Sequence, residues 1–405
     1  ISGSVMFSQM TAGKPVKVVT STGNGELIKA EVMIDVNRNE GKIVGLERKK
    51  EKWRGTRVEL EVKEVSYARS RYGPFNYLRL TAIANPHVSI TFVEPDGTLT
   101  TFENAVKEVP KKPVPLLPHP LGMLPDDLLS IARTTKARTI STMLSTELSR
   151  VSKQKAEQVC KIAEIPPAKK PVEMSWGDAE RILAAFKKVK ILAPSAEGLR
   201  PIGAAAIIEG MRQILNPEFV HAITRPPKVY RGGVPFVVEV GVAYGGNAGV
   251  GGGEKENESE EAGIELLRFA NRAPLLFDQG GCVMTAALKS IDWRRYGVDP
   301  VTAPVTLMIN ISSAYVPYTS AGKQSVADEP EIYEEIRAAI MEVARELKSY
   351  LFRKIRLRER KERVQVFEKY LPVIANKAAR LAGVKPPDIS SLLKKIAGGE
   401  YAEKD

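Results

Sequence analysis

The segment PEIYEEIRAAIMEVARELKSYLFRKI, residues 330–355, has a regular hydrophobic pattern. Its apolar residues recur every three or four positions, which places them on one face of an α-helix. Pro330 can open this helix, because the first N–H of a helix has no partner within the helix. The segment therefore predicts a long helix with a continuous apolar stripe over about six turns. The stripe consists of Ile332, Ile336, Ile340, Val343, Leu347, Leu351 and Ile355.

Strand-like runs precede this helix, beginning at about Pro226. A loop rich in Gly and Glu, residues 245–263, interrupts them. This part of the chain is predicted to combine helix and strand. The predicted strands are Phe236–Val242, Glu265–Ala270 and Val305–Ile311, and the predicted helix is Met284–Ile291.

Residues 1–110 also mix helix and strand. A helix, Ser4–Met10, should end at Gly13-Lys14-Pro15. Alternating apolar and polar residues are typical of half-buried antiparallel strands. Three strands, a second helix and a hairpin are predicted: Val16–Thr20, Leu27–Val36, Thr56–Val62, the helix Asn76–Asn85, and Ser89–Glu94 paired with Leu99–Glu103.

A proline-rich stretch, Pro110–Pro120, indicates a boundary before a helical module. The hydrophobic periodicity from Asp126 to about Lys190 is that of helices. Ser152 can cap one of them at Lys153. Ser175 and Asp178 have the spacing of a capping box before Ala179–Val189.

The composition of the 405 residues bounds the class of protein. The length suggests two to four domains. The net charge of +12 favours a polyanionic partner. No apolar stretch is long enough for a transmembrane helix, and the first ten residues do not resemble a signal peptide. Two cysteines and three histidines, none at metal-ligand spacing, predict no metal site and fit a reducing cytoplasm.

Four segments can be compared with phosphate-binding loops. Ile1-Ser2-Gly3 leads into a helix whose free N–H groups and positive dipole end suit phosphate, although these residues taken alone favour a serine helix cap without a ligand. Gly13-Lys14-Pro15 and Gly249–Gly253 do not match the P-loop pattern. Lys323, on a Gly-supported turn, can contact phosphate as a point charge or can simply be solvated.

A dense basic run lies at residues 345–363. It holds nine basic and three acidic residues, and so carries half of the chain's net positive charge. The run is either a phosphate-facing surface or an exposed helix end. Its basic residues are Arg345, Lys348, Arg353, Lys354, Arg356, Arg358, Arg360, Lys361 and Arg363.

Several runs, in this order, resemble the topoisomerase VI B subunit family, which belongs to the type IIB DNA topoisomerases and to the GHKL (Bergerat) ATPase superfamily. The resemblance covers residues 1 to about 370. It is carried by Ile1-Ser2-Gly3, Ser8–Val18, Trp53–Glu59, Thr81–His87, Ser130–Ser149, Thr224–Gly232, Arg268–Leu276, Asp292–Gly297 and the loop with Lys323.

The resemblance implies an α+β fold in several parts. The first is the rear of a Bergerat-type ATPase sandwich, with an antiparallel sheet and helices on one face. A helix-two-turns-helix insert follows, and then a transducer domain with a mixed sheet and the long helix. The implied domains are 1–117, 118–196, 197–355 and a basic helical extension, 356–405.

The resemblance also implies a function. The chain would be the ATP-hydrolysing subunit of an enzyme that passes one DNA duplex through a double-strand break in another. ATP and Mg²⁺ would be its cofactors. Its partners would be double-stranded DNA and an A subunit that carries the cutting tyrosine, in an A₂B₂ heterotetramer without a membrane. Backbone N–H groups of Ile1, Ser2 and Gly3 would bind ATP, and Lys323 would act on its γ-phosphate.

One departure from the family pattern concerns the start of the chain. The family's catalytic Glu, magnesium-binding Asn and adenine-binding Asp lie upstream of the motif that Ile1 continues. We therefore expect the chain to be part of a larger subunit. The alternatives are a non-enzymatic DNA-binding or scaffold fragment and a MutL-like ATPase, and the helical insert argues against the second.

Overall fold

The computed structural model describes residues 2–35, 38, 40–114, 116–192, 198–249, 264–390 and 392. The chain divides into two compact units, Ile1–Ala68 and Arg69–Asp405. Among the described helices, none combines the length and the apolar content that crossing a membrane requires.

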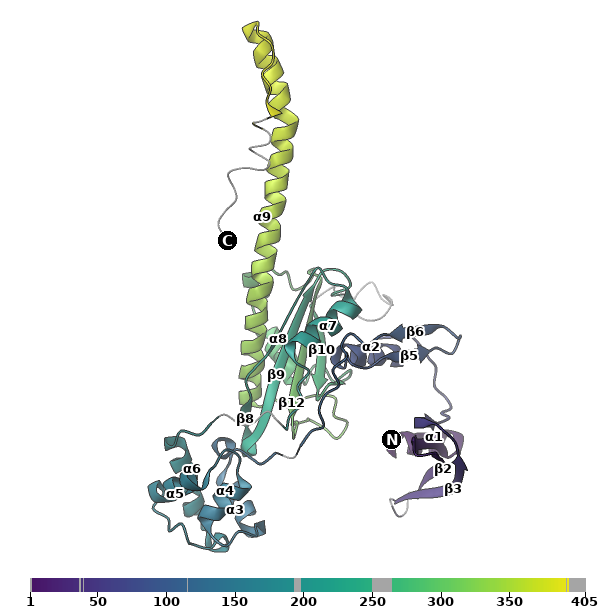
Figure 1. The fold of residues 1–405 in the computed structure, drawn as a ribbon, viewed down its shortest axis with the longest axis vertical. Helices are drawn as coiled ribbons and strands as arrows, with labels where there is room; N and C mark the ends of the chain where they lie inside the picture. The colour runs from purple at the N-terminus through teal and green to yellow at the C-terminus, as the bar shows by residue number, and fades with distance from the viewer. Residues whose placement is uncertain are drawn as a thin grey trace. The chain divides into compact units, whose positions relative to one another are not determined.

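The first unit is one helix on an antiparallel four-stranded sheet (Figure 1). The helix α1 (Ser2–Ala12) packs mainly against β2. The Gln9 amide binds both backbone polar groups of Ile34, accepting from its N–H and donating to its carbonyl. The order of the strands is β3-β2-β1-β4. They are β1 (Val16–Thr22), β2 (Glu26–Asp35), β3 (Glu40–Lys50) and β4 (Arg54–Glu59).

The predicted helix and three strands of this unit are confirmed, but β3 was missed. Nearly every residue of β3 is exposed, because β3 lies at the edge of the sheet while α1 packs mainly against β2. Its charged sequence therefore lacks the alternation that burial of one face produces. A register shift between Glu31 and Val32 further disrupts its pairing with β2.

The second unit begins with a helix and a hairpin, both as predicted. These are α2 (Pro74–Ala84) and the antiparallel pair β5 (Ile90–Val93) and β6 (Leu99–Phe102). Phe75 of α2 packs against Phe92 and Phe102, with ring centroids 6.2 and 5.8 Å away. This contact holds the hairpin onto the helix.

A module of four helices follows and has a hydrophobic core of its own. Ser152 accepts a hydrogen bond from the Lys155 N–H, and Ser175 and Asp178 form a capping box, so both predicted caps are confirmed. The helices are α3 (Pro125–Thr134), α4 (Ile140–Glu147), α5 (Lys153–Ile162) and α6 (Trp176–Lys188). Short 3-10 turns lie in this module at Pro120–Gly122 and Pro171–Glu173, and later in the chain at Arg231–Gly233 and Trp293–Tyr296.

A mixed sheet forms the rest of the unit, in the order β11-β10-β12-β9-β7, with β8 paired to β9. Only β10 and β12 are parallel among the described strands. The mixed sheet implied by the resemblance is confirmed. Most of the predicted Gly- and Glu-rich loop, residues 250–263, lies outside the described residues. The strands are β7 (Phe219–Thr224), β8 (Lys228–Tyr230), β9 (Val234–Tyr244), β10 (Glu265–Ala270), β11 (Ala273–Pro274) and β12 (Val305–Ser313).

The predicted start of the strands at Pro226 was wrong. The strand β7 ends at Thr224 and follows another missed element, the helix α7 (Ala204–Leu215). The strand is only half-buried, so its short sequence gives a weak periodic signal.

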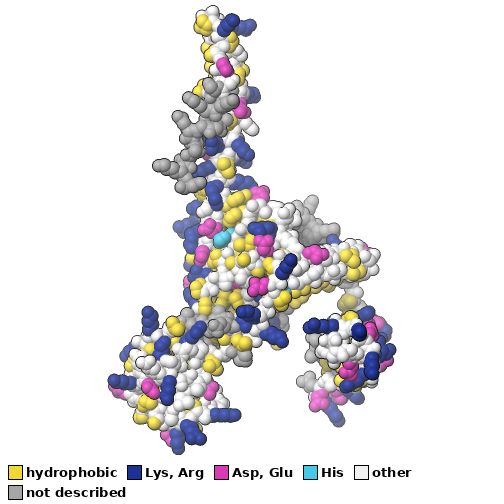
Figure 2. All heavy atoms as spheres, viewed as in Figure 1, with side chains coloured by type: hydrophobic (Ala, Val, Ile, Leu, Met, Phe, Trp, Pro, Cys, Tyr) yellow, Lys and Arg dark blue, Asp and Glu magenta, His cyan; other side chains and the backbone are white. Residues whose placement is uncertain are grey.

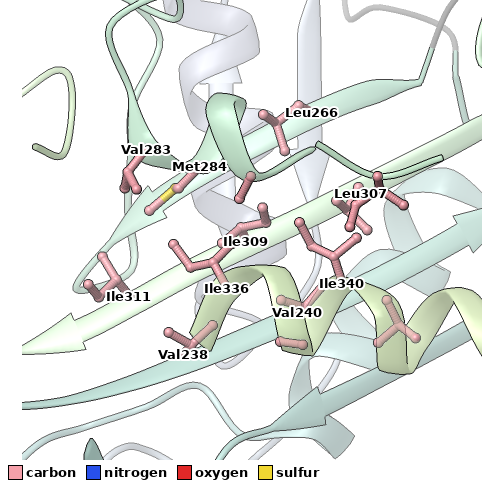
Figure 3. Packing of buried hydrophobic residues seen from close by; sticks show 14 of the residues in the cluster. Val238, Val240, Leu266, Val283, Met284, Leu307, Ile309, Ile311, Ile336 and Ile340 are labelled. Carbon is pink, nitrogen blue, oxygen red and sulfur yellow. The ribbon is translucent and has the colours of Figure 1, made fainter. Parts of the chain in front are cut away.

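Helices cover both faces of this sheet. On one face, α8 (Val283–Lys289) and α9 (Pro330–Ala382) pack against Val238, Val240 and Ile309 (Figure 3). On the other face, α2 and α7 pack against Phe269 and Met308. The helices α2 and α7 approach closely at Gly210, where an added Cβ would lie 2.4 Å from the Ile83 carbonyl oxygen.

The long helix predicted from residues 330–355 is confirmed and extends to Ala382. The stripe is buried from Ile332 to Leu351, whereas its last member, Ile355, is 53% exposed. The periodicity continues there, but α9 has passed the end of the sheet (Figure 1). The side chain therefore has no core to pack against within the described chain.

Candidate functional site

Lys323 lies at the tip of a turn between β12 and α9. A β-bridge between Tyr318 and Val326 closes the turn, and the Thr319 N–H donates to the Ser325 carbonyl over 3.0 Å. The Lys323 N–H donates to the Ser320 carbonyl over 3.1 Å. The lysine side chain is exposed, with Nζ 5.9 Å from the centroid of the Tyr318 ring. The ammonium group is therefore accessible to an anionic ligand.

The backbone of Lys323 is in the left-handed region, with φ at 54°. The sequence predicted that glycine would support this turn, yet the positive φ falls on Lys323 and not on Gly322. A residue with a Cβ pays roughly 1–2 kcal/mol for this conformation. Strain of this kind is common at ligand-binding and switching positions.

The base of the turn is buried in the core and hydrogen-bonded to the segment Phe277–Val283. Ser325 and Val326 are fully buried, and the Val326 carbonyl accepts from the Val283 N–H at the start of α8 over 3.0 Å. Gln324 accepts through its side chain from the Phe277 N–H over 3.3 Å. Burial raises the pKa of Tyr318. The exposed lysine side chain thus projects from a buried, hydrogen-bonded base.

The other predicted phosphate-binding residues belong to the first unit. Ser2 and Gly3 are in the first turn of α1, and Ile1 lies outside the described residues. Gly3 is exposed, and open space surrounds the position where its Cβ would lie. The first N–H groups of α1 have no partner within the helix, so they suit an anion.

Ser2 and Gly3 belong to one unit and Lys323 to the other. Their convergence on one nucleotide is therefore a prediction that rests on the resemblance. The described residues contain no group of three or more His, Cys, Asp or Glu side chains suited to a metal ion. The expected magnesium ligand was placed upstream of Ile1.

The basic run lies on α9, mostly where the helix has left the sheet (Figure 2). Three of its basic residues make ion pairs that limit their availability, and one of them is Arg363, which lies 4.0 Å from Glu359. Lys354 pairs with Glu218, which raises the pKa of the lysine, and Arg358 pairs with Glu362 at 2.9 Å. Exposed apolar side chains accompany the run: Phe352, Ile355, Leu357, Val366, Phe367, Tyr370, Val373 and Ile374.

Sequence reasoning missed the role of two buried charges in the sheet. Glu239, fully buried on β9, accepts from the backbone N–H groups of Ile202 and Gly203 at 2.8 and 2.6 Å, just before α7. Arg268, 3% exposed on β10, donates to the carbonyl oxygen of Gln324. A charged residue flanked on both sides by apolar residues of a strand was the available signal, because such a charge must be hydrogen-bonded when buried.

Comparison with known proteins agrees with this architecture. Residues 194–363 match the family model described as "Topoisomerase VI B subunit, transducer". The match includes the mixed sheet, the Lys323 turn and the first part of α9.

The similarity extends beyond this segment. The chain is 45% identical to the type 2 DNA topoisomerase 6 B subunit of Thermococcus onnurineus, over 100% of this chain and 78% of the relative. It is also 45% identical to the protein of that name from Methanothermobacter thermautotrophicus, over 98% of this chain and 75% of the relative. A solved N-terminal domain of a DNA repair protein gives a TM-score of 0.33 at 9% identity, over 85% of this chain and 75% of that one, and this score is too low to be informative. The identity to the two relatives over nearly the whole chain shows that the chain belongs to the family of type 2 DNA topoisomerase 6 B subunits.

Proposed function

We propose that this chain acts as the ATP-driven gate of a type IIB DNA topoisomerase, which passes one DNA duplex through a transient double-strand break in another. The observation that carries the function is the 45% identity to a topoisomerase 6 B subunit over the whole chain. The aligned region includes the four-helix module, which counts against a MutL-like ATPase. Cutting belongs to a separate A subunit, so the tyrosines of this chain are not nucleophiles in this proposal.

ATP and magnesium are the proposed cofactors, and the described residues fit a bound triphosphate. The N–H groups of Ser2 and Gly3 open α1, and each charge-assisted bond to a phosphate would contribute about 1.5–3 kcal/mol. The exposed ammonium of Lys323 would bind the terminal phosphate. ATP supplies the phosphoryl group that is transferred to water. Ile1 is proposed to bind beside Ser2 on the basis of the resemblance alone.

Lys323 is the proposed sensor of that phosphate. Its ammonium gains Coulomb energy when an anion is present and loses it on release, which is the differential binding that a switch requires. The same charge would stabilise the transferring group during hydrolysis. The turn is continuous with β12 on one side and with α9 on the other. A displacement of Lys323 toward the phosphate would therefore be transmitted to α9 through the buried, hydrogen-bonded base of the turn.

Domain boundaries at 117, 196 and 355 are also proposed, as the resemblance implies. The separate core of the helical module supports the first two. The third is supported by the last contacts of α9 with the sheet region, which are made by the buried Leu351 and by Lys354, whose Nζ lies 5.3 Å from the Tyr244 ring centroid.

An A subunit and DNA are the proposed partners, in an A₂B₂ assembly in the cytoplasm. The exposed part of α9 carries both basic and apolar side chains. Basic residues suit phosphates, whereas an exposed apolar row favours a protein surface. We therefore propose that the A subunit binds the exposed apolar side chains of α9 and that DNA binds its basic residues.

The test of the proposed function uses the full-length subunit that contains this chain, assembled with its A subunit. We expect ATP-dependent relaxation of supercoiled DNA and binding of a non-hydrolysable ATP analogue by the B subunit. A full-length subunit that binds no nucleotide would instead support the scaffold alternative.

A further inference from the structure

The segment Phe277–Gln279, between β11 and α8, contacts the stretch 69–73. The ring of Tyr72 stacks on Phe277 with centroids 5.3 Å apart and planes 14° from parallel. Arg71 donates through Nη2 to Gln279 Oε1 over 2.6 Å. The stretch 69–73 opens the second unit and continues directly from the first unit along the chain.

This stretch is itself held in place within the second unit. The buried side chain of Asn76 donates to the Arg71 carbonyl over 2.6 Å. Arg69 donates through Nε to Glu94 Oε1 over 2.9 Å. A displacement of 69–73 would therefore act on Phe277–Gln279 and would not be absorbed by a loose connection.

Arg268 joins the other side of Phe277–Gln279 to the Lys323 turn. Its Nη2 donates to the Phe277 carbonyl over 2.8 Å, and its Nη1 lies 3.4 Å from the carbonyl oxygens of both Asp278 and Gln324. The Phe277 N–H in turn donates to the Gln324 side chain. One buried guanidinium thus bridges two segments that lie far apart in the sequence.

Arginine is suited to this task in a way that lysine is not. A buried guanidinium is tolerated only when its donors are hydrogen-bonded. Its planar fork presents several N–H groups in fixed directions, whereas an ammonium is a point charge on a flexible stem. The three carbonyl acceptors of Arg268 come from two segments, so their relative position depends on that fork.

We propose that Arg268 is a positioning residue for Lys323. It fixes the Lys323 turn to Phe277–Gln279, and so to the stretch that leads in from the first unit. The inference rests on the proposed role of Lys323 at the terminal phosphate. Loss of the bridge would let the turn move without removing the lysine charge.

Misplacement of a group that acts in the transition state lowers kcat more than it changes substrate binding. An error of about 1 Å in such a group can cost up to about 100-fold in rate. Arg268→Lys in the full-length B subunit, assembled with its A subunit, should therefore lower the kcat of ATP hydrolysis about 10-fold. The KM for ATP should stay within about twofold, since Lys323 itself is retained.

Gln324→Ala is the second variant, because it removes only a half-exposed side chain and does not threaten folding. It should also lower kcat, by about threefold to fivefold. Gln213→Ala is the matched control: this exposed α7 side chain donates to the Glu103 carbonyl, outside the Lys323 turn. That variant should hydrolyse ATP at the unaltered rate.

Arg268→Lys combined with Lys323→Ala separates positioning from a general structural role. If Arg268 acts through Lys323, the double variant should be no slower than Lys323→Ala alone. A further 10-fold loss would refute positioning and indicate structural damage. Hydrogen exchange at the Thr319 and Phe277 amides should accelerate in Arg268→Lys, and unchanged exchange would also refute the proposal.

The Lys323 variant and the two bridge variants test different roles. Normal turnover by Lys323→Ala would overturn the proposed function of the lysine. A slow Lys323→Ala together with an unaltered kcat in both Arg268→Lys and Gln324→Ala would overturn the positioning proposal and leave the sensor intact.

Discussion

Glu335 attaches α9 to the sheet, and its replacement by Gln should weaken that attachment. The carboxyl group is 1% exposed and accepts from Arg225 Nε over 2.6 Å, while Lys228 pairs with its second oxygen. Removing one partner of a buried pair typically costs about 3–5 kcal/mol. Arg225 keeps a second partner, Glu342, at 2.7 Å, and Lys228 is half exposed. We therefore expect a loss at the lower end, about 3 kcal/mol.

The matched control is Glu342→Gln, which removes the other carboxylate bound by Arg225. Glu342 is 40% exposed, so its pair should contribute less than about 1 kcal/mol. The contrast between the two glutamates isolates burial, because both contact the same guanidinium from the same helix.

Trp293 offers a local probe for this measurement, because it is 5% exposed and lies in the core that includes α9. The chain has three tryptophans, so Trp53→Phe and Trp176→Phe leave Trp293 as the only indole. Urea unfolding followed by its fluorescence would then report on this core. Equal effects of the two glutamate variants, or a loss below about 1 kcal/mol for Glu335→Gln, would refute the argument.

The free energy of unfolding measured with this fluorescence should depend on pH in a defined direction. Burial raises the pKa of Glu335, but hydrogen bonds from Arg225 and Lys228 outweigh burial and hold the pKa below its usual value of 4.5. A depressed pKa stabilises the folded state above the unfolded value. This stability is lost as the pH falls below 4.5 toward the folded pKa. The Glu335→Gln variant should therefore lose less unfolding free energy on acidification than the parent chain. An equal loss in both proteins would contradict the assignment.

Three further predictions concern the proposed function. Lys323→Ala should slow ATP hydrolysis about 10²–10³-fold in the assembled enzyme, whereas the exposed Lys289→Ala should not; near-normal turnover with normal DNA relaxation would refute the sensor. Ser2→Pro removes a backbone N–H at the start of α1 and should weaken nucleotide binding in the full-length subunit, so an unaltered affinity would count against that contact. Each phosphate-contacting residue replaced on α9 should reduce the salt slope of DNA binding by about 0.9; a slope that is unaffected by replacing all six would exclude DNA, and loss of A-subunit binding would favour the protein partner. The six are Arg353, Lys354, Arg356, Arg358, Arg360 and Lys361.

Several features were predictable because they depend on neighbours along the chain. The start of α9 at Pro330, the cap at Ser152 and the capping box at Ser175 all follow from residues within one or two helical turns. Family membership was predictable for a similar reason. The runs that carry the resemblance follow one another along the sequence and can be recognised without knowledge of their tertiary contacts. The exposed strand β3 and the half-buried β7 were missed because weak burial leaves little periodicity.

The limit of local reasoning is clearest on α9. The apolar stripe runs through Leu351 to Ile355 with unbroken spacing, yet Leu351 is buried and Ile355 is 53% exposed. Periodicity reports which residues share a helix face, but not where the sheet beneath that face ends.

The sequence by itself determined the helix at 330, its apolar face, the helical module and the identity of Lys323 as a candidate. Only the tertiary structure decided that the strain of the turn falls on Lys323, that Arg268 holds the turn, and that Glu335 attaches α9. Arg268 and Gln324 are 56 positions apart, and Arg225 and Glu335 are 110 apart. Hydrogen bonds over such separations leave no periodic trace, because their partners become neighbours only when the sheet has brought the strands and α9 together.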